Sequence, residues 1–138
     1  MGNRLALAVI TAVLGACASA PPAPRVAPQT LDDYKHAVAM RIAALNPATY
    51  SAPPPEMLKS VVVLEITVDS VGAPLEVSVF RSNGYPDLTQ RAITAVIDAS
   101  PFGAPAPALL QGDSVNFFET FLFRDDDSFQ LRSLVGER

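Results

Sequence analysis

The stretch from Ser60 to Asp69 has the clearest pattern in the chain, because apolar side chains recur there at every second position. This spacing predicts a β-strand with one face in the core. Residues 75–79 alternate in the same way, and residues 69–73 between them include Gly72, which can adopt a positive φ at a turn. The pattern predicts a β-hairpin with one solvated face.

Two other segments show the three- and four-residue spacing of apolar positions that is typical of an amphipathic helix. The first covers residues 30–46, and Thr30 followed by Asp33 is typical of a helix cap. The second covers residues 88–99 and ends before Pro101. Each apolar stripe is predicted to pack against the core.

Residues 114–124 predict a last strand, and the residues after Asp125 show no clear periodicity. The phenylalanines of this strand fall on both of its faces: Phe117, Phe118, Phe121 and Phe123. The order of elements is helix, strand, strand, helix, strand. We therefore expect an α+β fold, a three-stranded antiparallel sheet with helices on one face.

The N-terminus has the layout of a secretory signal, with Arg4, an apolar run over residues 5–14, and small residues at 15 and 16. The apolar run is too short for a transmembrane helix, which needs about 20 residues. Leu14-Gly15-Ala16-Cys17 resembles a lipobox, so Cys17 is the predicted lipid-attachment residue and residues 1–16 are the predicted lipoprotein signal peptide. Two or more acyl chains on Cys17 would anchor the protein stably to a membrane.

Other interpretations of the N-terminus stay open at this point. An ordinary signal peptide could be cut within residues 16–20, where small residues recur. Myristoylation is disfavoured because Ala6 stands where that pattern requires Ser or Thr. After Cys17 come Ala18 and Ser19 rather than Asp, which resembles the outer-membrane sorting pattern of lipoproteins. We expect a protein on the periplasmic side of a bacterial membrane, with the outer membrane favoured.

The chain divides into three parts. After the signal peptide, residues 17–30 contain the lipidated cysteine and a proline-rich linker, whose reach at about 3.1 Å per residue is roughly 40 Å. Residues 31–138 form one domain by length. Cys17 is the single cysteine, so no disulfide is expected and the domain must be stabilised by packing.

Composition and motifs exclude several functions. The formal net charge of −4 argues against nucleic acid as a partner and against docking onto anionic lipid through a basic patch. Residues 125–127 are three consecutive aspartates, but they lack the alternate spacing of a calcium loop, and a solvated loop is favoured. No catalytic motif or metal-ligand spacing occurs, and His36 lies on a charged helix face. We expect no enzyme activity, no cofactor and no metal.

Short motifs follow one another in order between residues 61 and 123. They are Val68-Asp69 with Gly72, Val77-Ser78-Val79, Ser82-Asn83-Gly84, Leu88-Thr89-Gln90-Arg91-Ala92-Ile93-Thr94-Ala95-Val96, and Ser100-Pro101-Phe102 with Pro105 and Pro107. In this order they resemble the C-terminal domain of TonB and TolA proteins, where the same features precede a final Phe-rich strand. The sequence departs from that family at Thr89, where Asp is usual, and at Arg91, which replaces Ala.

The resemblance implies a protein-binding module. Domains of this family bind by strand addition, in which an extended peptide pairs with an open sheet edge. TonB and TolA also carry an inner-membrane helix and a long envelope-spanning segment, which this sequence does not show, so only the binding module carries over. The candidate partner-binding edge strand is the last strand, represented by Val115, Phe117, Glu119, Phe121 and Phe123.

This strand lacks the lysines, prolines and bulges that usually protect a sheet edge, and only Arg124 flanks it. The alternative is that residues 128–135 cover it within the same molecule. We expect a non-catalytic lipoprotein that captures an extended segment of an envelope protein, with a link to outer-membrane transport. A structural lipoprotein that scaffolds envelope machinery is the alternative function, and the same edge would also permit a homodimer.

Overall fold

The computed structural model describes residues 29–135, so the predicted signal peptide, Cys17 and most of the predicted linker lie outside the described residues. The helices and strands are α1 (Leu31–Ala44), β1 (Ser60–Asp69), β2 (Pro74–Arg81), α2 (Pro86–Ala99), β3 (Ser114–Phe123) and β4 (Phe129–Leu131). Two short 3₁₀ helices complete the fold: η1 (Pro107–Leu109) and η2 (Arg132–Leu134).

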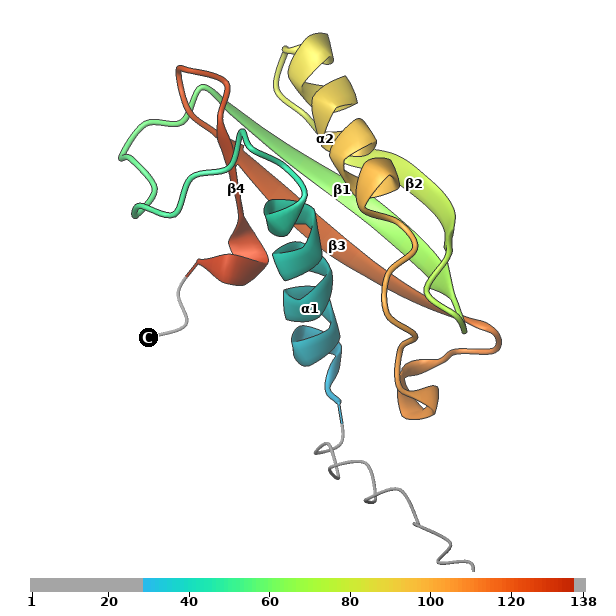
Figure 1. The fold of residues 1–138 in the computed structure, drawn as a ribbon. Helices are drawn as coiled ribbons and strands as arrows, with labels where there is room; N and C mark the ends of the chain where they lie inside the picture. The colour runs from blue at the N-terminus through green and yellow to red at the C-terminus, as the bar shows by residue number, and fades with distance from the viewer. Residues whose placement is uncertain (1–28, 136–138) are drawn as a thin grey trace, which may run out of the picture.

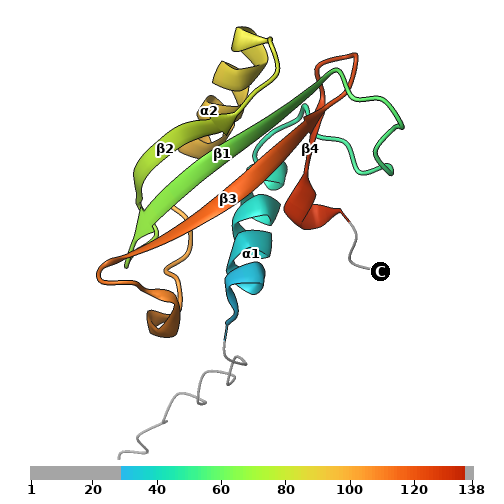
Figure 2. The same ribbon diagram turned by 180° about the vertical axis from the view of Figure 1, so that it is seen from behind.

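The strands form one antiparallel sheet in the order β2-β1-β3-β4, and α1 and α2 cover one face of it (Figure 1). Seen from behind, the other face carries neither of the two α-helices in residues 29–135 (Figure 2). The α+β class is confirmed, but the prediction of three strands was wrong because the structure has four. Strand β4 spans only Phe129–Leu131, which is too short to show a periodic pattern in the sequence.

The β1–β2 hairpin is confirmed, with buried residues at every second position of β1. The carboxylate of Asp69 holds its turn, because Oδ1 accepts hydrogen bonds from the backbone N–H of Val71 at 3.0 Å and of Ala73 at 2.9 Å. Gly72 has φ +88° and its carbonyl oxygen accepts a hydrogen bond from the N–H of Phe102 at 2.9 Å. The hairpin turn is thereby fixed to the loop that follows α2.

Helix α1 begins at the predicted cap, since the Thr30 and Asp33 side chains each accept the other residue's backbone N–H. Its buried stripe includes Tyr34, whose ring meets Phe117 edge-to-face with centroids 5.8 Å apart. The Tyr34 hydroxyl donates to the carbonyl oxygen of Gly103 at 2.9 Å. Burial, and secondarily the charge of Asp69, raises the pKa of Tyr34 to about 12, so this hydroxyl remains a donor at physiological pH.

Strand β4 closes one end of the sheet with aromatic packing. The ring of Phe129 lies 5.2 Å from that of Phe121 and 5.6 Å from that of Phe123, and all three side chains are fully buried. Residues 48–50 cover the outer side of β4, because the N–H of Phe129 bonds to the carbonyl oxygen of Ala48 and the N–H of Tyr50 bonds to that of Phe129. The backbone of Phe129 therefore has no side free for a further strand.

Candidate functional site

Strand β3 lies between β1 and β4 and is not the outermost strand. It pairs with β1 along its whole length, but β4 pairs only with Phe121–Phe123. On the side away from β1, residues Ser114–Thr120 have no partner strand within the described part of the chain, apart from one bridge between Ser114 and Gln111. We call Ser114–Thr120 the open edge of β3.

Alternate residues of β3 present their backbone groups to this open edge. The carbonyl oxygen of Phe123 accepts from Lys59 on the β1 side, whereas the N–H of Arg124 donates to Ser128 on the opposite side. Consecutive residues of a strand point their N–H and C=O groups to opposite sides, and the β1–β3 register has no bulge. The N–H and C=O groups of Asn116, Phe118 and Thr120 therefore point to the open edge.

The five residues predicted for the partner-binding edge all lie on β3, but their side chains point into the helix-covered core. Their exposed fractions are 2% or less: Val115, Phe117, Glu119, Phe121 and Phe123. Their backbone groups point toward β1. Sequence reasoning located the strand but missed Asn116, Phe118 and Thr120 as the residues facing the edge, although the alternation of a strand is enough to distinguish the two sets once the neighbour is known.

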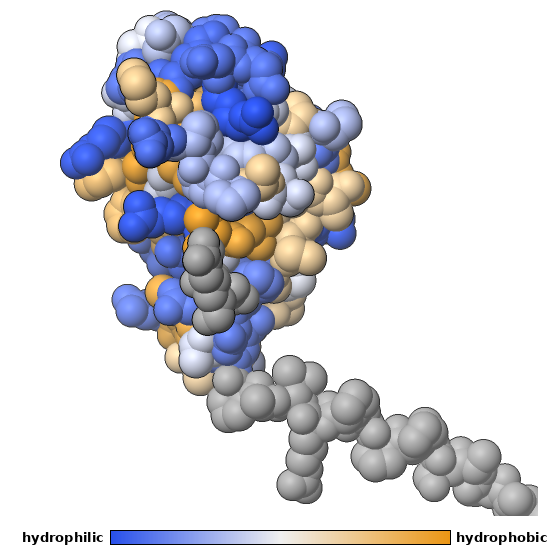
Figure 3. Space-filling view, turned by 90° about the vertical axis from the view of Figure 1, so that its left-hand side faces the viewer, coloured by the Kyte–Doolittle hydropathy of each residue, from blue (hydrophilic) through white to orange (hydrophobic). Residues whose placement is uncertain are grey.

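Two hollows lie along the open edge. One, of about 420 Å³, lies between the start of α1, η2 and β3, and is lined by Asp32, Lys35, Phe118, Glu119, Thr120, Arg132 and Ser133. The other, of about 520 Å³, lies at the opposite end of the edge and is lined by Leu31, Ala108, Leu109, Gln111, Ser114, Val115 and Asn116. On the side of the molecule that carries β4 and η2, hydrophilic and hydrophobic side chains are interspersed (Figure 3).

The side chain of Glu119 ends the open edge. Its Oε1 accepts hydrogen bonds from the backbone N–H of Thr120 at 2.9 Å and of Ser133 at 3.3 Å, so the carboxylate occupies the place of a pairing strand at Thr120. Glu119 is 2% exposed, and its Oε2 has no hydrogen-bond partner among the described residues. Burial raises the pKa of this carboxyl group, while the hydrogen bonds to Ser133 and Thr120 and the charge of Lys35 lower it.

The raised pKa of Glu119 predicts a pH-dependent stability. An unfolded glutamate titrates near a pKa of about 4.3, whereas burial keeps the folded-state carboxyl group protonated to higher pH. Its contribution to stability is present below the unfolded pKa and is lost as the pH rises through the folded pKa. We expect the free energy of unfolding of Glu119→Gln, relative to wild type, to rise in urea titrations as the pH increases above the unfolded-state pKa of about 4.3. Parallel pH profiles for the two proteins would contradict this assignment.

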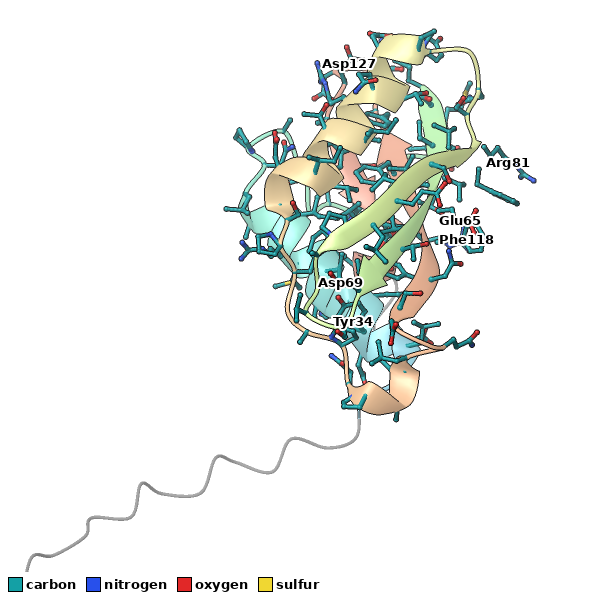
Figure 4. All side chains as sticks on the ribbon, turned by 90° about the vertical axis from the view of Figure 1, so that its right-hand side faces the viewer. Tyr34, Glu65, Asp69, Arg81, Phe118 and Asp127 are labelled. Atoms are coloured by element: carbon teal, nitrogen blue, oxygen red, sulfur yellow. The ribbon has the colours of Figure 1, made fainter. Side chains whose placement is uncertain are left out.

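The helix-free face of the sheet carries an exposed aromatic pair. The rings of Phe80 and Phe118 meet edge-to-face with centroids 4.9 Å apart, and these side chains are 61% and 41% exposed. Phe118, Glu65 and Arg81 project from the sheet on the side away from the helices (Figure 4). Because Phe118 belongs to the open edge as well, this pair lies beside any strand that would pair there.

Strand β2 forms the other end of the sheet and is also an edge. It begins with Pro74 and carries Glu76 and Arg81, and prolines and charges are features that discourage pairing at an edge. None of the residues lining the two hollows along β3 lies on β2. The β2 edge and the open edge of β3 therefore differ in their surroundings. Substitutions on β2 can serve as controls for strand pairing at β3.

The other residues considered for chemistry are engaged in the structure. Asp127 pairs with Lys59 at 2.6 Å, and Asp126 Oδ1 accepts from the N–H of Ser128 at 3.0 Å. Nδ1 of His36 lies 3.3 Å from the carbonyl oxygen of Ser133. Within residues 29–135 no group of three or more His, Cys, Asp or Glu side chains is placed to hold a metal ion.

Neither α1 nor α2, the two α-helices in the described part of the chain, has the length and apolar character needed to cross a membrane. Comparison of the chain with protein-family models, with curated proteins and with solved structures finds no match.

Proposed function

We propose that this chain is a non-catalytic, lipid-anchored protein of the bacterial envelope that captures an extended segment of another envelope protein by strand addition. The observation that carries the proposal is the open edge of β3, where Asn116 and Phe118 direct N–H and C=O groups away from the sheet. Unpaired backbone groups at a sheet edge are the groups that such binding uses. Hollows at both ends of this edge leave room for the side chains of an added strand.

The tail of the domain limits the edge without closing it. Strand β4 occupies Phe121–Phe123, and η2 reaches Glu119 through the N–H of Ser133. The rest of the edge, Ser114–Thr120, would span about 20 Å at 3.4 Å per residue, which is long enough for a short peptide strand. The proposed mode is therefore capture of a short segment.

The proposed location follows from the N-terminal sequence. Residues 1–16 as signal peptide and Cys17 as the lipidated residue would place the domain on the periplasmic side, with the outer membrane favoured by Ala18 and Ser19. A linker reach of roughly 40 Å would keep the open edge close to that membrane. A partner with a periplasmic segment, such as an outer-membrane transporter, suits this position and the TonB/TolA resemblance.

The test is photo-crosslinking in cells from position 116, on the open edge, compared with position 76 on β2. We expect an adduct with an envelope protein from position 116 and none from position 76. Phe118→Pro removes an N–H that points to the open edge, and we expect it to reduce the adduct about tenfold, as the loss of one or two hydrogen bonds would. The matched control is Val79→Pro on β2. Leu64 pairs with Glu119 and directs its backbone groups toward β3, so its neighbour Val79 on β2 directs its N–H away from β1. The substitution therefore removes an outward N–H from β2.

Circular dichroism and thermal unfolding would establish that both proline variants are folded. Equal adduct yield from wild type and a folded Phe118→Pro variant would refute pairing at the open edge. An adduct lost in Val79→Pro but retained in Phe118→Pro would assign the binding edge to β2.

A structural lipoprotein that scaffolds envelope machinery is the second candidate function. It is favoured by the exposed pair Phe80 and Phe118 on the helix-free face, since exposed aromatic side chains are enriched at protein interfaces. In that case Phe80→Ser would abolish partner crosslinking, and Phe118→Pro would act only through the loss of its ring. Phe118→Ala, which keeps the backbone N–H, separates the two functions.

A further inference from the structure

If the proposed strand addition is correct, the two ends of the open edge of β3 determine where a bound peptide strand (the visiting strand) pairs with it. At one end Gln111 donates its N–H to the carbonyl oxygen of Ser114, and at the other the Glu119 carboxylate accepts the N–H of Thr120. Asn116 and Phe118 are the two residues between these blocked positions whose N–H and C=O groups both point outward. A visiting strand would therefore hydrogen-bond to Asn116 and Phe118 in one alignment.

This alignment places two side chains of the visitor near the two hollows. Side chains on one face of a strand are two residues apart, and cross-strand neighbours share a face. Residues of the visitor opposite Val115 and Glu119 would thus project to the helix-covered side, one toward each hollow. In the visiting segment these two residues are four positions apart, whichever direction it runs.

The hollow beside Glu119 has two basic side chains in its lining. Lys35 from α1 and Arg132 from η2 line it, and neither forms an ion pair with another described residue. Asp32 is the one exposed carboxylate of the lining, because Glu119 is buried and held by the N–H groups of Thr120 and Ser133. Two cations facing one exposed anion favour a carboxylate as the visiting group.

The hollow at the other end is apolar where it meets α1. Leu31 is 40% exposed there, beside Leu109 and the edge residue Val115. Gln111, Ser114 and Asn116 supply its polar rim. An apolar side chain placed on Leu31 would remove that exposed surface from water.

We propose that the open edge of β3 selects extended segments in which an acidic residue and an apolar residue stand four positions apart. The carboxylate lies between Lys35 and Arg132, and the apolar side chain packs on Leu31 and Leu109. Backbone pairing with Asn116 and Phe118 holds the segment, and the two hollows determine which segment is held. Strand addition is the proposed function, and this selectivity is a separate property of the same edge.

The test uses the full chain in detergent micelles to select binders from a phage-displayed library of random peptides. We expect the enriched peptides to share an Asp or Glu four positions from an apolar residue. In fluorescence anisotropy, Lys35→Gln/Arg132→Gln should weaken the best such peptide about tenfold, while Arg81→Gln on β2 leaves its affinity unchanged. Replacing Asp by Asn, or Glu by Gln, in the peptide should lower its affinity for wild type by the same factor. The same replacement should cause no further loss of affinity for the double variant.

The outcomes separate the two proposals. Some peptides could bind wild type, lose binding to Phe118→Pro, and yet show no preference for an acidic residue and bind the double variant with equal affinity. This result would overturn the selectivity and leave strand addition intact. If no enriched peptide depends on Phe118 for binding, both strand addition and the selectivity are overturned. Self-association that Phe118→Pro abolishes, without peptide enrichment, would assign the edge to a second copy of the chain and also overturn the selectivity.

Discussion

Replacement of Phe121 by alanine is expected to lower the free energy of unfolding by about 3–5 kcal/mol, the usual cost of deleting a buried aromatic ring. Phe121 is fully buried, and its ring stacks near Phe123 with centroids 6.4 Å apart and lies 5.2 Å from Phe129. The variant would lose one of the two ring contacts that Phe129 of β4 makes with the core, and the contact with Phe123 would remain. Urea unfolding should show a midpoint lower by about 2 M, given a slope near 2 kcal/mol per molar.

Phe118→Ala is the matched control, since it makes the same chemical change three residues away on the same strand. Phe118 is 41% exposed and contacts Phe80 on the helix-free face. We expect this variant to lose about 1 kcal/mol, the worth of a partly exposed aromatic pair. Equal destabilisation by the two substitutions would show that the strand does not present alternate faces to core and solvent as described.

Gly72→Ala is expected to lower the free energy of unfolding by about 3 kcal/mol, from a backbone cost and a steric cost together. Gly72 has φ +88°, a conformation that residues with a Cβ rarely adopt. An added Cβ would also lie 2.6 Å from the carbonyl oxygen of Gly103 and would clash with that of Phe102. The hairpin turn and the loop after α2 would have to separate. Differential scanning calorimetry would measure the loss.

The control for this prediction is Gly84→Ala. Gly84 has φ +80°, but an added Cβ would meet nothing within 4 Å. The backbone cost of about 1 kcal/mol is therefore the whole expected effect. A Gly72→Ala variant no less stable than Gly84→Ala would rule out tight packing of residues 102 and 103 on the hairpin turn.

The Phe121 prediction and the binding predictions concern different sides of the same strand, β3. The core-facing residues of β3 hold the domain together, whereas Asn116 and Phe118 direct their backbone groups outward. A substitution that abolishes binding can thus leave the fold intact, as required of Phe118→Pro. The same separation makes the helix-side cations Lys35 and Arg132 suitable for testing selectivity, because neither is part of the buried core.

Local periodicity was enough to predict the elements that are long. The alternation in β1, the turn with Asp69 and Gly72, and the Thr30 cap of α1 all follow from interactions within a few residues along the chain. In each case the hydrophobic pattern and the local hydrogen bonds favour the same structure. Strand β2 pairs as predicted, but its apolar residues Leu75 and Val79 are exposed. The α+β class could be predicted from these elements alone.

The end of the chain could not be predicted in this way. Strand β4 has three residues, and it exists because Phe129 packs on Phe121 and Phe123 and bonds to residues 48–50, which are distant in the sequence. Pairing of this kind depends on which segments the tertiary fold brings together, and short strands carry no periodic signal of their own. The expectation of a three-stranded sheet failed for this reason.

The sequence by itself determined that residues 114–124 form a strand with phenylalanines on both faces, that a hairpin and two helices accompany it, and that Cys17 is the last residue of a lipobox-like tetrapeptide. Only the tertiary structure decided which side of β3 is left open. Three contacts define the open side. Strand β1 pairs with β3 along its whole length, β4 pairs with β3 only as far as Phe121, and the buried Glu119 carboxylate accepts the N–H of Thr120. These are long-range contacts, and no pattern confined to neighbouring residues contains them.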